Sequence, residues 1–302
     1  MHWFFVALIP PFLWAITNHL DKYLLNKYAK QIKLASFIIF AGFFVLPLAI
    51  FILIFKPHVV HIPVQYALMM MTAGIFFTIY LFPYYRALII EDTSIVVPMF
   101  QMVPILGFIL AFIFLREHLE AKQILAGIII ILGSIGLSLE LSEKIRLKSQ
   151  VFFLMFIASL LVSIGVLTYK FVAIKTDYWT AIFWEEIGMI VAVIFLFFIK
   201  DNRKNFIESV LTQNRNFMIV MTFNEILNRG AGLIVSYAFL LVPIALVQLV
   251  SSVQPLFVFI MGIIMAVFLP KFSLENMTRK FLVQKIVFIC LILLGSYLLF
   301  GS

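Results

Sequence analysis

Ten long apolar segments dominate this sequence and decide what it can fold into. They cover approximately residues 3–25, 34–55, 65–86, 93–115, 121–140, 151–174, 179–200, 216–241, 243–269 and 280–300. A helix needs about 20 apolar residues to cross the hydrocarbon core of a bilayer. Backbone polar groups in lipid must bond within their own segment, and continuous apolar runs do not alternate as barrel strands do. The sequence therefore predicts an all-α integral membrane protein with ten transmembrane helices.

The composition agrees with lipid as the solvent. Hydrophobic residues make up 64% of the chain and charged residues 12%, whereas a soluble domain has about half and roughly a quarter. The formal charge of +8 comes mostly from short loops, which is typical of membrane orientation and not of a nucleic-acid-binding surface. The single cysteine, Cys290, excludes an internal disulfide and a multi-cysteine metal site. Because the first segment lacks a basic leader and a small-residue cleavage site, we expect it to be a mature helix.

The chain also divides into two halves that resemble each other. Tyr85-Arg86-Ala87-Leu88 precedes Pro104 with the spacing at which Ser236-Tyr237-Ala238-Phe239 precedes Pro255. Gln123 and Gly133 match Lys285 and Gly295 once an insertion near residues 270–278 is allowed. An odd number of segments per half inserts the second half upside down, and inverted repeats are a recurrent transporter architecture with a midplane solute site. We therefore predict two inverted five-helix repeats, residues 1–145 and 146–302.

Loop charges predict the orientation of these repeats. One side carries thirteen basic residues: Lys27, Lys30, Lys33, Lys144, Arg146, Lys148, Lys200, Arg203, Lys204, Arg215, Lys271, Arg279 and Lys280. The other side, with both termini, carries Lys56, Arg116, Lys122 and Lys175. The positive-inside rule then predicts that both termini lie outside the cytoplasm.

Polar residues at membrane depth are the candidate functional groups, because ionisable side chains there are costly. Arg229 lies near the middle of the eighth segment, and Glu225 stands one helical turn earlier, so an ion pair between them is available. Asn228 extends this polar face, and Glu185 and Glu186 lie deep in the seventh segment. These residues either form a structural network between helices or line a solute cavity. In a cavity, one of the three glutamates would be a proton-coupling group.

Five further residues complete the candidate site. Lys22 and Lys170 end the first and sixth segments and are candidates for gates or anion-attracting groups at the two cavity mouths. Tyr80 and Tyr237 are candidates to hydrogen-bond a solute, and Gln248 is expected to face the interior. Interior charges of both signs fit a zwitterionic solute, although a self-paired network has the same composition.

The motif residues resemble a known family. The first half carries Tyr85-Arg86-Ala87-Leu88, Ser94, Pro98, Pro104, Leu115-Arg116-Glu117, Gln123, Gly127 and Gly133, and the second half a weaker copy, Tyr237-Ala238, Pro255, Gly262 and Gly295. This pattern resembles the EamA repeat of the drug/metabolite transporter superfamily, although the second half lacks the Leu-x-Glu element. The resemblance implies a ten-helix carrier that works by alternating access. It also implies cytoplasmic termini, which the loop charges contradict.

These observations favour a secondary active transporter. No loop between the apolar segments is long enough for an ATPase domain, and the enzyme motifs HExxH and GxSxG are missing from the sequence. We expect an exporter or exchanger of a small polar metabolite in the bacterial cytoplasmic membrane, with protons as a candidate coupling ion and no cofactor or metal. The alternative is a flippase for a lipid-linked or phosphorylated substrate, whose phosphate would suit deep basic residues such as Arg229 and Lys22. The substrate and the oligomeric state stay open.

Overall fold

The structure is a computed structural model that describes residues 2–28, 32–91, 93–138, 149–213, 215–268 and 279–300. Every element in these ranges is a helix. The expected boundary between the halves at residues 145 and 146 lies outside the described residues. So do Lys30, Lys144, Arg146, Lys148 and Lys271 of the loop-charge count.

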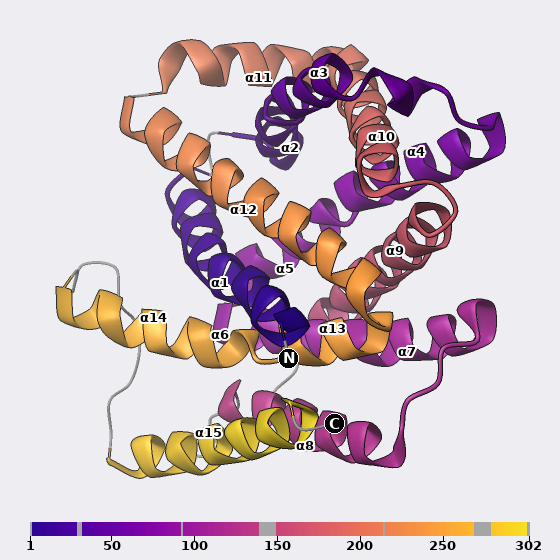
Figure 1. Ribbon diagram of the computed structural model, residues 1–302. Coiled ribbons are helices and arrows are strands. Elements are labelled where there is room, and N and C mark those ends of the chain that lie inside the picture. The colour runs from indigo at the N-terminus through magenta and orange to yellow at the C-terminus, as the bar shows by residue number, and fades with distance from the viewer. Residues whose placement is uncertain are drawn as a thin grey trace.

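The helices follow the apolar segments closely (Figure 1). Those of the first half are α1 (His2–Tyr28), α2 (Leu34–Phe43), α3 (Val45–Phe55), η1 (Pro57–Val60), α4 (Val64–Ile79), α5 (Leu81–Ile90), α6 (Thr93–Val96), η2 (Val97–Gln101), α7 (Met102–Leu115) and α8 (Ala121–Ser138). Those of the second half are α9 (Ser149–Ala173), α10 (Tyr178–Phe198), α11 (Lys200–Thr212), α12 (Arg215–Leu241), α13 (Ile244–Ser251), α14 (Gln254–Phe268) and α15 (Arg279–Phe300).

Within the described residues, seven helical stretches are long and apolar enough to cross a membrane. They are His2–Tyr28, Leu34–Phe55, Val64–Ile90, Val97–Leu115, Ser149–Ala173, Tyr178–Phe198 and Ile244–Ile264. Two further apolar helices, Ala121–Gly136 and Lys285–Phe300, are shorter. The eighth predicted span, α12, is long but is not among the seven, because Asn224, Glu225, Asn228 and Arg229 lower its hydropathy. The chain is thus a multi-pass membrane protein, whereas the count of ten spans stays a prediction.

The two halves interleave. Helix α1 packs along α12 and against α14 of the second half, while α9 packs along α4 and α7 of the first half. Helices α8 and α15 lie side by side below this bundle (Figure 1). The centre of the molecule is therefore built from both halves at once.

A close crossing of α4 and α10 depends on two glycines. A Cβ atom on Gly74 would lie 2.8 Å from the backbone nitrogen of Met189, and a Cβ atom on Gly188 would lie 2.6 Å from the carbonyl carbon of Met71. Glycine allows the two backbones to approach each other, as small residues do in membrane helix pairs. This contact fixes the position of Glu185 and Glu186, which stand within one turn of Gly188.

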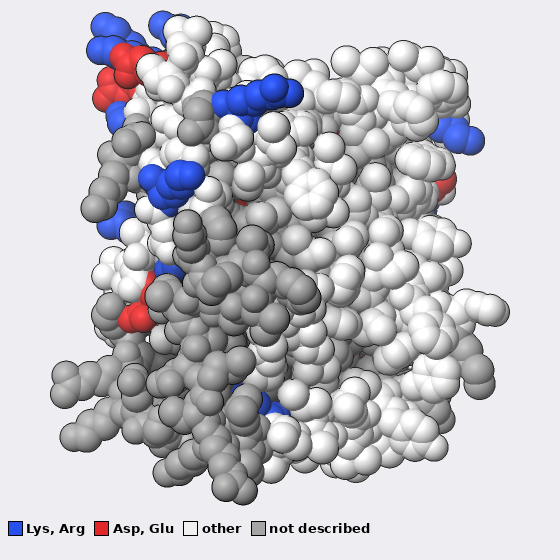
Figure 2. Space-filling view, turned by 90° about the vertical axis from the view of Figure 1, so that its left-hand side faces the viewer, with Lys and Arg blue, Asp and Glu red and all other residues white. Residues whose placement is uncertain are grey.

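The surface agrees with a lipid environment. Figure 2 shows one side of the molecule on which most described side chains are uncharged, with Lys, Arg, Asp and Glu gathered mainly along one edge. Many large apolar side chains are exposed, among them Phe195, Phe198 and Tyr297. Such a broad apolar surface marks a membrane-facing protein.

The start of α10 is capped by Asp177, which lies in the loop before the helix. Its carboxylate accepts hydrogen bonds from the backbone nitrogens of Trp179, at 2.9 Å, and Thr180, at 3.1 Å, and from the Thr180 hydroxyl. His58 lies 3.6 Å away. Burial raises the pKa of Asp177, but the hydrogen bonds from Thr180 and Trp179 lower it by more, so the pKa lies below its ordinary value of 3.8.

We expect Asp177→Ala to lower the free energy of unfolding by about 1 kcal/mol, as the loss of a helix cap does. Because the folded-state pKa is lowered, the contribution is present above the ordinary carboxyl pKa and disappears as the pH falls through the folded-state value. Unfolding of the two proteins at pH 7 and near pH 3 checks this. The difference should shrink in acid, while Asp201→Ala, an exposed control on α11, should change little at either pH. An equal difference at both pH values would contradict the capping role.

Candidate functional site

A cavity of about 230 Å³ lies at the centre of the bundle, between helices of both halves. Residues from α1, α4, α5, η2 and α7 of the first half line it together with residues from α9, α10, α12, α13 and α14 of the second. A single buried water needs only about 10–15 Å³ of such space. The cavity is therefore large enough for several waters or a small solute.

Broken helices border this cavity. The chain interrupts one membrane segment at Tyr80, between α4 and α5, and another between α13 and α14, next to Pro255. At the second break the Ser252 carbonyl accepts hydrogen bonds from the side chains of Gln101, at 3.2 Å, and Ser134. Irregular backbone at membrane depth is tolerated where it is buried in protein or lines a cavity.

One polar cluster joins α1, α5 and α12. The Asp21 carboxylate accepts hydrogen bonds from the Asn224 amide at 2.8 Å and from the Tyr84 hydroxyl at 3.3 Å. The Tyr84 hydroxyl also lies 2.9 Å from the side-chain oxygen of Asn18. Glu225 is buried on the same helix as Asn224. The donors that hold Asp21 are thus neutral groups.

A second polar cluster joins α10 and α12. The Arg229 guanidinium lies 3.8 Å from the Glu186 carboxylate and 2.7 Å from the sulfur of Met189. The pair of Arg229 with Glu225 that the spacing makes available is not among the ion pairs of the described residues, and both Glu225 oxygens lack a hydrogen-bond partner there. The arginine instead reaches across to Glu186 of α10.

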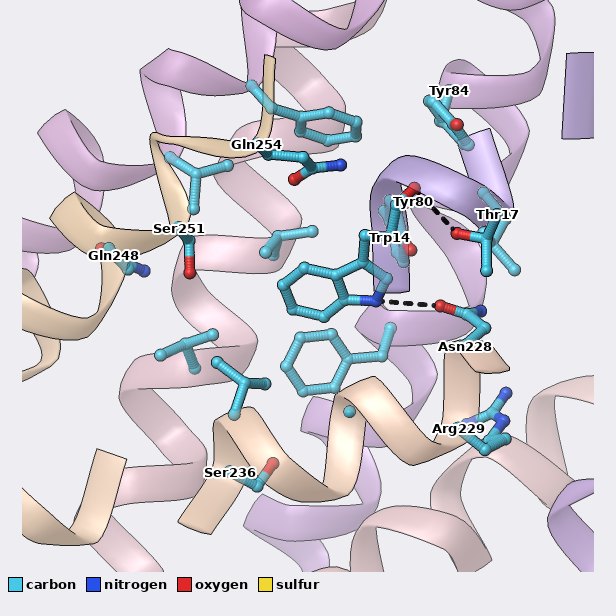
Figure 3. A pocket seen from close by; sticks show the side chains of 18 of the residues that line it. Trp14, Thr17, Tyr80, Tyr84, Asn228, Arg229, Ser236, Gln248, Ser251 and Gln254 are labelled. Carbon is cyan, nitrogen blue, oxygen red and sulfur yellow. Dashed lines mark hydrogen bonds between the residues drawn. The ribbon is translucent and has the colours of Figure 1, made fainter. Parts of the chain in front are cut away.

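Trp14 stands across the cavity (Figure 3). Its indole nitrogen donates to the side-chain oxygen of Asn228 at 3.1 Å, which links α1 to α12. Gln248, Ser251 and Gln254 lie on another wall of the same space, as the close view shows. The walls thus combine aromatic faces with polar groups.

Several buried polar atoms of the cavity wall have no hydrogen-bond partner within the described part of the chain. They are Asn18 Nδ2, Gln101 Oε1, the Tyr169 hydroxyl oxygen, Glu185 Oε2, Glu186 Oε2, Arg229 Nε, and both side-chain polar atoms of Gln248. Buried polar groups are otherwise almost always paired, with protein or with water. These atoms therefore leave hydrogen-bonding capacity for water or a polar ligand.

The structure brings six of the ten predicted site residues to the cavity wall: Glu185, Glu186, Asn228, Arg229, Tyr80 and Gln248. The other four, all described, are not part of its lining: Glu225, Lys22, Lys170 and Tyr237. Glu225 is buried next to the Asp21 cluster, while Tyr237 is 49% exposed and packs edge-on against Tyr178.

The two lysines donate to carbonyls at helix ends, and their role at the cavity mouths stays a prediction. Lys22 donates to the carbonyls of Leu88, at 2.7 Å, and Glu91, at 2.9 Å, where α5 ends. Lys170 donates to the Val242 carbonyl at 2.8 Å, where α12 ends, and forms an ion pair with Glu117. Ammonium groups stabilise the unpaired carbonyls of helix C-termini.

Glu117 connects three helices at this point. Besides its ion pair with Lys170 of α9, its carboxylate accepts a hydrogen bond at 2.8 Å from the backbone nitrogen of Ile244, where α13 begins. The side chains of Lys170 and Glu117 are only 11% and 14% exposed. The glutamate of the Leu-x-Glu element thus ties the first half to the second.

We expect Glu117→Gln to destabilise the fold by about 3 kcal/mol, because it leaves the ammonium of Lys170 in a largely buried site without its carboxylate. The double variant Glu117→Leu with Lys170→Met removes both charges and should recover a large part of that loss. Thermal unfolding of the purified proteins measures both. The role of the pair would be contradicted if the single variant unfolded like the parent.

On α1, sequence reasoning chose Lys22 and not the four residues that line the cavity. These are Trp14, Thr17, Asn18 and Asp21. They fall at positions i, i+3, i+4 and i+7, which places them on one face of a helix. That spacing of polar residues within an apolar segment was a usable signal.

Comparisons with known proteins agree with this architecture. Residues 1–139 match the sequence model of the EamA-like transporter family, so the resemblance inferred from the sequence is confirmed for this part of the chain. A crystal structure of another protein aligns over 98% of this chain and 94% of its own, with a TM-score of 0.65 and 11% sequence identity. That similarity demonstrates a shared fold. No curated protein matches the sequence.

Proposed function

We propose that this chain, whose residues 1–139 match the sequence model of the EamA-like transporter family, is a secondary active transporter of a small polar solute. We propose an exporter or exchanger of the bacterial cytoplasmic membrane that works by alternating access. The observation on which the proposal depends is the central polar cavity, lined by both halves of the chain between membrane-spanning helices.

The cavity has the properties that a carrier site needs. It combines apolar walls with a few convergent polar groups, as small-molecule sites do. Buried atoms such as Glu185 Oε2 and the side-chain amide of Gln248 lack protein partners in the described residues. A bound solute would satisfy them, and its departure would return them to water.

Inverted repeats would supply the motion, and the helix pair α8 and α15 supports this part of the proposal. A Cβ atom on Gly133 would lie 2.9 Å from Ile292, and one on Gly295 would lie 2.7 Å from Ile130. Each isoleucine stands three residues before the glycine of its own helix. This reciprocal contact is what two related helices produce around a two-fold axis.

The contact between Gln101 and Ser252 supports the same relation. The two positions are equivalent when the first half is aligned to the second through Pro104 and Pro255. Gln101 donates to the carbonyl of Ser252 across the interface between the halves. In alternating access the broken segments near these residues would act as hinges while the halves rock.

The flippase alternative has less support. It would use deep cations for a phosphate group, but Arg229 is engaged by Glu186 and Lys22 donates to backbone carbonyls.

Proton coupling through Glu185, Glu186 or Glu225 stays part of the carrier proposal. Neutralising all three would remove the pH dependence of exchange if one of them binds the coupling proton. Orientation, with both termini outside, is tested by the accessibility of terminal tags.

The experiment that tests the proposal is exchange by the purified full-length chain in sealed liposomes. A panel of amino acids, amines and organic acids is first ranked by the thermal stabilisation that each gives, because a ligand that binds the folded state stabilises it. The best ligand, radiolabelled outside and unlabelled inside, should then accumulate by counterflow. Tight binding without counterflow would exclude a carrier of that ligand.

A further inference from the structure

The cavity contains more acidic than basic groups. Among the residues that line it are three carboxyl groups, Asp21, Glu185 and Glu186, and a single guanidinium, Arg229. A fourth carboxyl group, Glu225, is 1% exposed one helical turn before the arginine. Lys22 and Lys170, which could have balanced this charge, are not part of the lining among the described residues. The formal charge of the site is therefore negative.

The arginine is already engaged. Its guanidinium lies 3.8 Å from Glu186 and donates to the sulfur of Met189. The Glu186 side chain is 4% exposed and that of Arg229 is 20% exposed, so the pair is largely shielded from water. A solute carboxylate would have to compete with a protein carboxylate for the arginine. The Arg229 Nε atom has no hydrogen-bond partner in the described part of the chain, so the capacity of the site for an anion is reduced and not removed.

In the described part of the chain, two of these carboxyl groups form no ion pair within 4 Å. Asp21 is held by the neutral donors Asn224 and Tyr84. Glu185 is 7% exposed, lines the cavity, and its Oε2 atom has no hydrogen-bond partner in the described part of the chain. An unpaired carboxylate in a desolvated site is costly. A cationic ligand would offset that cost, as a bound proton does in its absence.

Aromatic side chains line the same space. Trp14 crosses the middle of the cavity, and Tyr80 and Tyr84 lie on the same side as Thr17 in Figure 3. Phe77 and Phe100 also belong to the wall. Aromatic faces attract cations as well as apolar groups. The wall can therefore hold both parts of a molecule that has a charged end and an apolar body.

We propose that the cavity binds organic cations, namely protonated amines attached to an aromatic or other apolar body. The paired state of Arg229 disfavours anions, and it also disfavours zwitterions, whose carboxylate would need a free cation. This inference rests on the proposed carrier function for its biological meaning, but the binding preference is a separate property. It names the ligand class that the acid-rich, aromatic cavity recognises.

Four compounds that share one phenyl body test this preference. They are 2-phenylethylamine as the cation, phenylalanine as the zwitterion, 3-phenylpropanoate as the anion and 2-phenylethanol as the neutral compound. Each is added at pH 7 to the purified full-length protein, and thermal unfolding and isothermal titration are recorded. We expect the amine to raise the melting temperature and to bind at least about tenfold more tightly than each of the others. Tighter or equal binding of the propanoate or of phenylalanine would overturn the proposal.

Two variants of cavity residues test which carboxyl groups cause the preference for the amine. Asp21→Asn and Glu185→Gln each remove one unpaired carboxylate, and each should bring the affinity for the amine closer to that for the alcohol. Glu208→Gln on α11 is the matched control. Glu208 pairs with Lys204 on the surface, outside the cavity lining of the described residues, so this variant should leave the preference unchanged. If both cavity variants fold and keep the full preference for the amine, the assignment is wrong. If one cavity variant does not fold, the other variant alone tests the assignment.

Transport separates this proposal from the carrier proposal. Counterflow of the amine in liposomes is expected if both are right. Binding of the amine without counterflow would contradict the carrier and leave the ligand class standing. Counterflow of the anion without binding of the amine would contradict the ligand class and leave the carrier proposal standing.

Discussion

Gly232→Leu is expected to abolish solute exchange while the protein stays folded. Gly232 lines the cavity, and a Cβ atom on it would meet nothing within 4 Å. A leucine side chain can therefore enter the cavity without a clash and occupy the space that a solute needs. The helix itself would gain about 1 kcal/mol, because glycine is a poor helix former in α12. We expect exchange to fall at least about a hundredfold, to background, with an unchanged or raised melting temperature.

Gly230 provides the matched control for this variant. It is on the same helix, two residues earlier, and a Cβ atom on it also meets nothing within 4 Å, but it is not part of the described cavity lining. Gly230→Leu should therefore keep exchange close to the parent. The measurement is counterflow in liposomes of the best-stabilising member of the solute panel. Equal exchange by both variants would mean that the cavity is not the solute path.

The second large effect is expected at the crossing of α4 and α10. Gly188→Ala places a Cβ atom against the backbone of Met71, 2.6 Å from its carbonyl carbon. A backbone cannot turn aside as a flexible side chain can, so the helices must separate. Overpacking of this kind costs about 1–3 kcal/mol and occasionally more. Because this crossing positions Glu185 and Glu186, exchange should fall together with stability.

Gly230→Ala is again the control, and the sign of the effect is the test. Alanine in place of glycine within an open helix position stabilises by about 1 kcal/mol, so the two variants should move the unfolding midpoint in opposite directions. Thermal unfolding of both purified proteins in the same detergent gives the comparison. A Gly188→Ala protein as stable as Gly230→Ala would refute the close crossing.

Much of the fold could be predicted from hydropathy alone, because the length of an apolar run is dictated by the bilayer. The limit of that reasoning is α12, whose Glu225 and Arg229 lower its hydropathy below that of the other long helices. These same polar residues are why the segment drew attention as a functional one. A helix that lines a polar cavity is less apolar than one that faces lipid on all sides.

The site was less predictable, since partners on other helices cannot be inferred from one helix. The spacing made an ion pair of Arg229 with Glu225, one turn away, available, but Arg229 pairs with Glu186 of α10. On α12, the helical spacing of the residues also indicated which side chains share the face of Arg229. At about 100° per residue, Ser236 shares the face of Arg229, whereas Tyr237 is turned away from it. Ser236 accordingly lines the cavity and Tyr237 is exposed.

The central claim is that one polar cavity opens to each side of the membrane in turn, and a single buried thiol tests it most directly. In a chain with Cys290→Ala, Ser236→Cys places the only thiol on the cavity wall, at a position that is 8% exposed. A membrane-impermeant maleimide is then added to sealed, oriented vesicles from outside or from inside. We predict labelling from both sides, slowed by a bound solute. Labelling from one side alone, or from neither, would contradict alternating access.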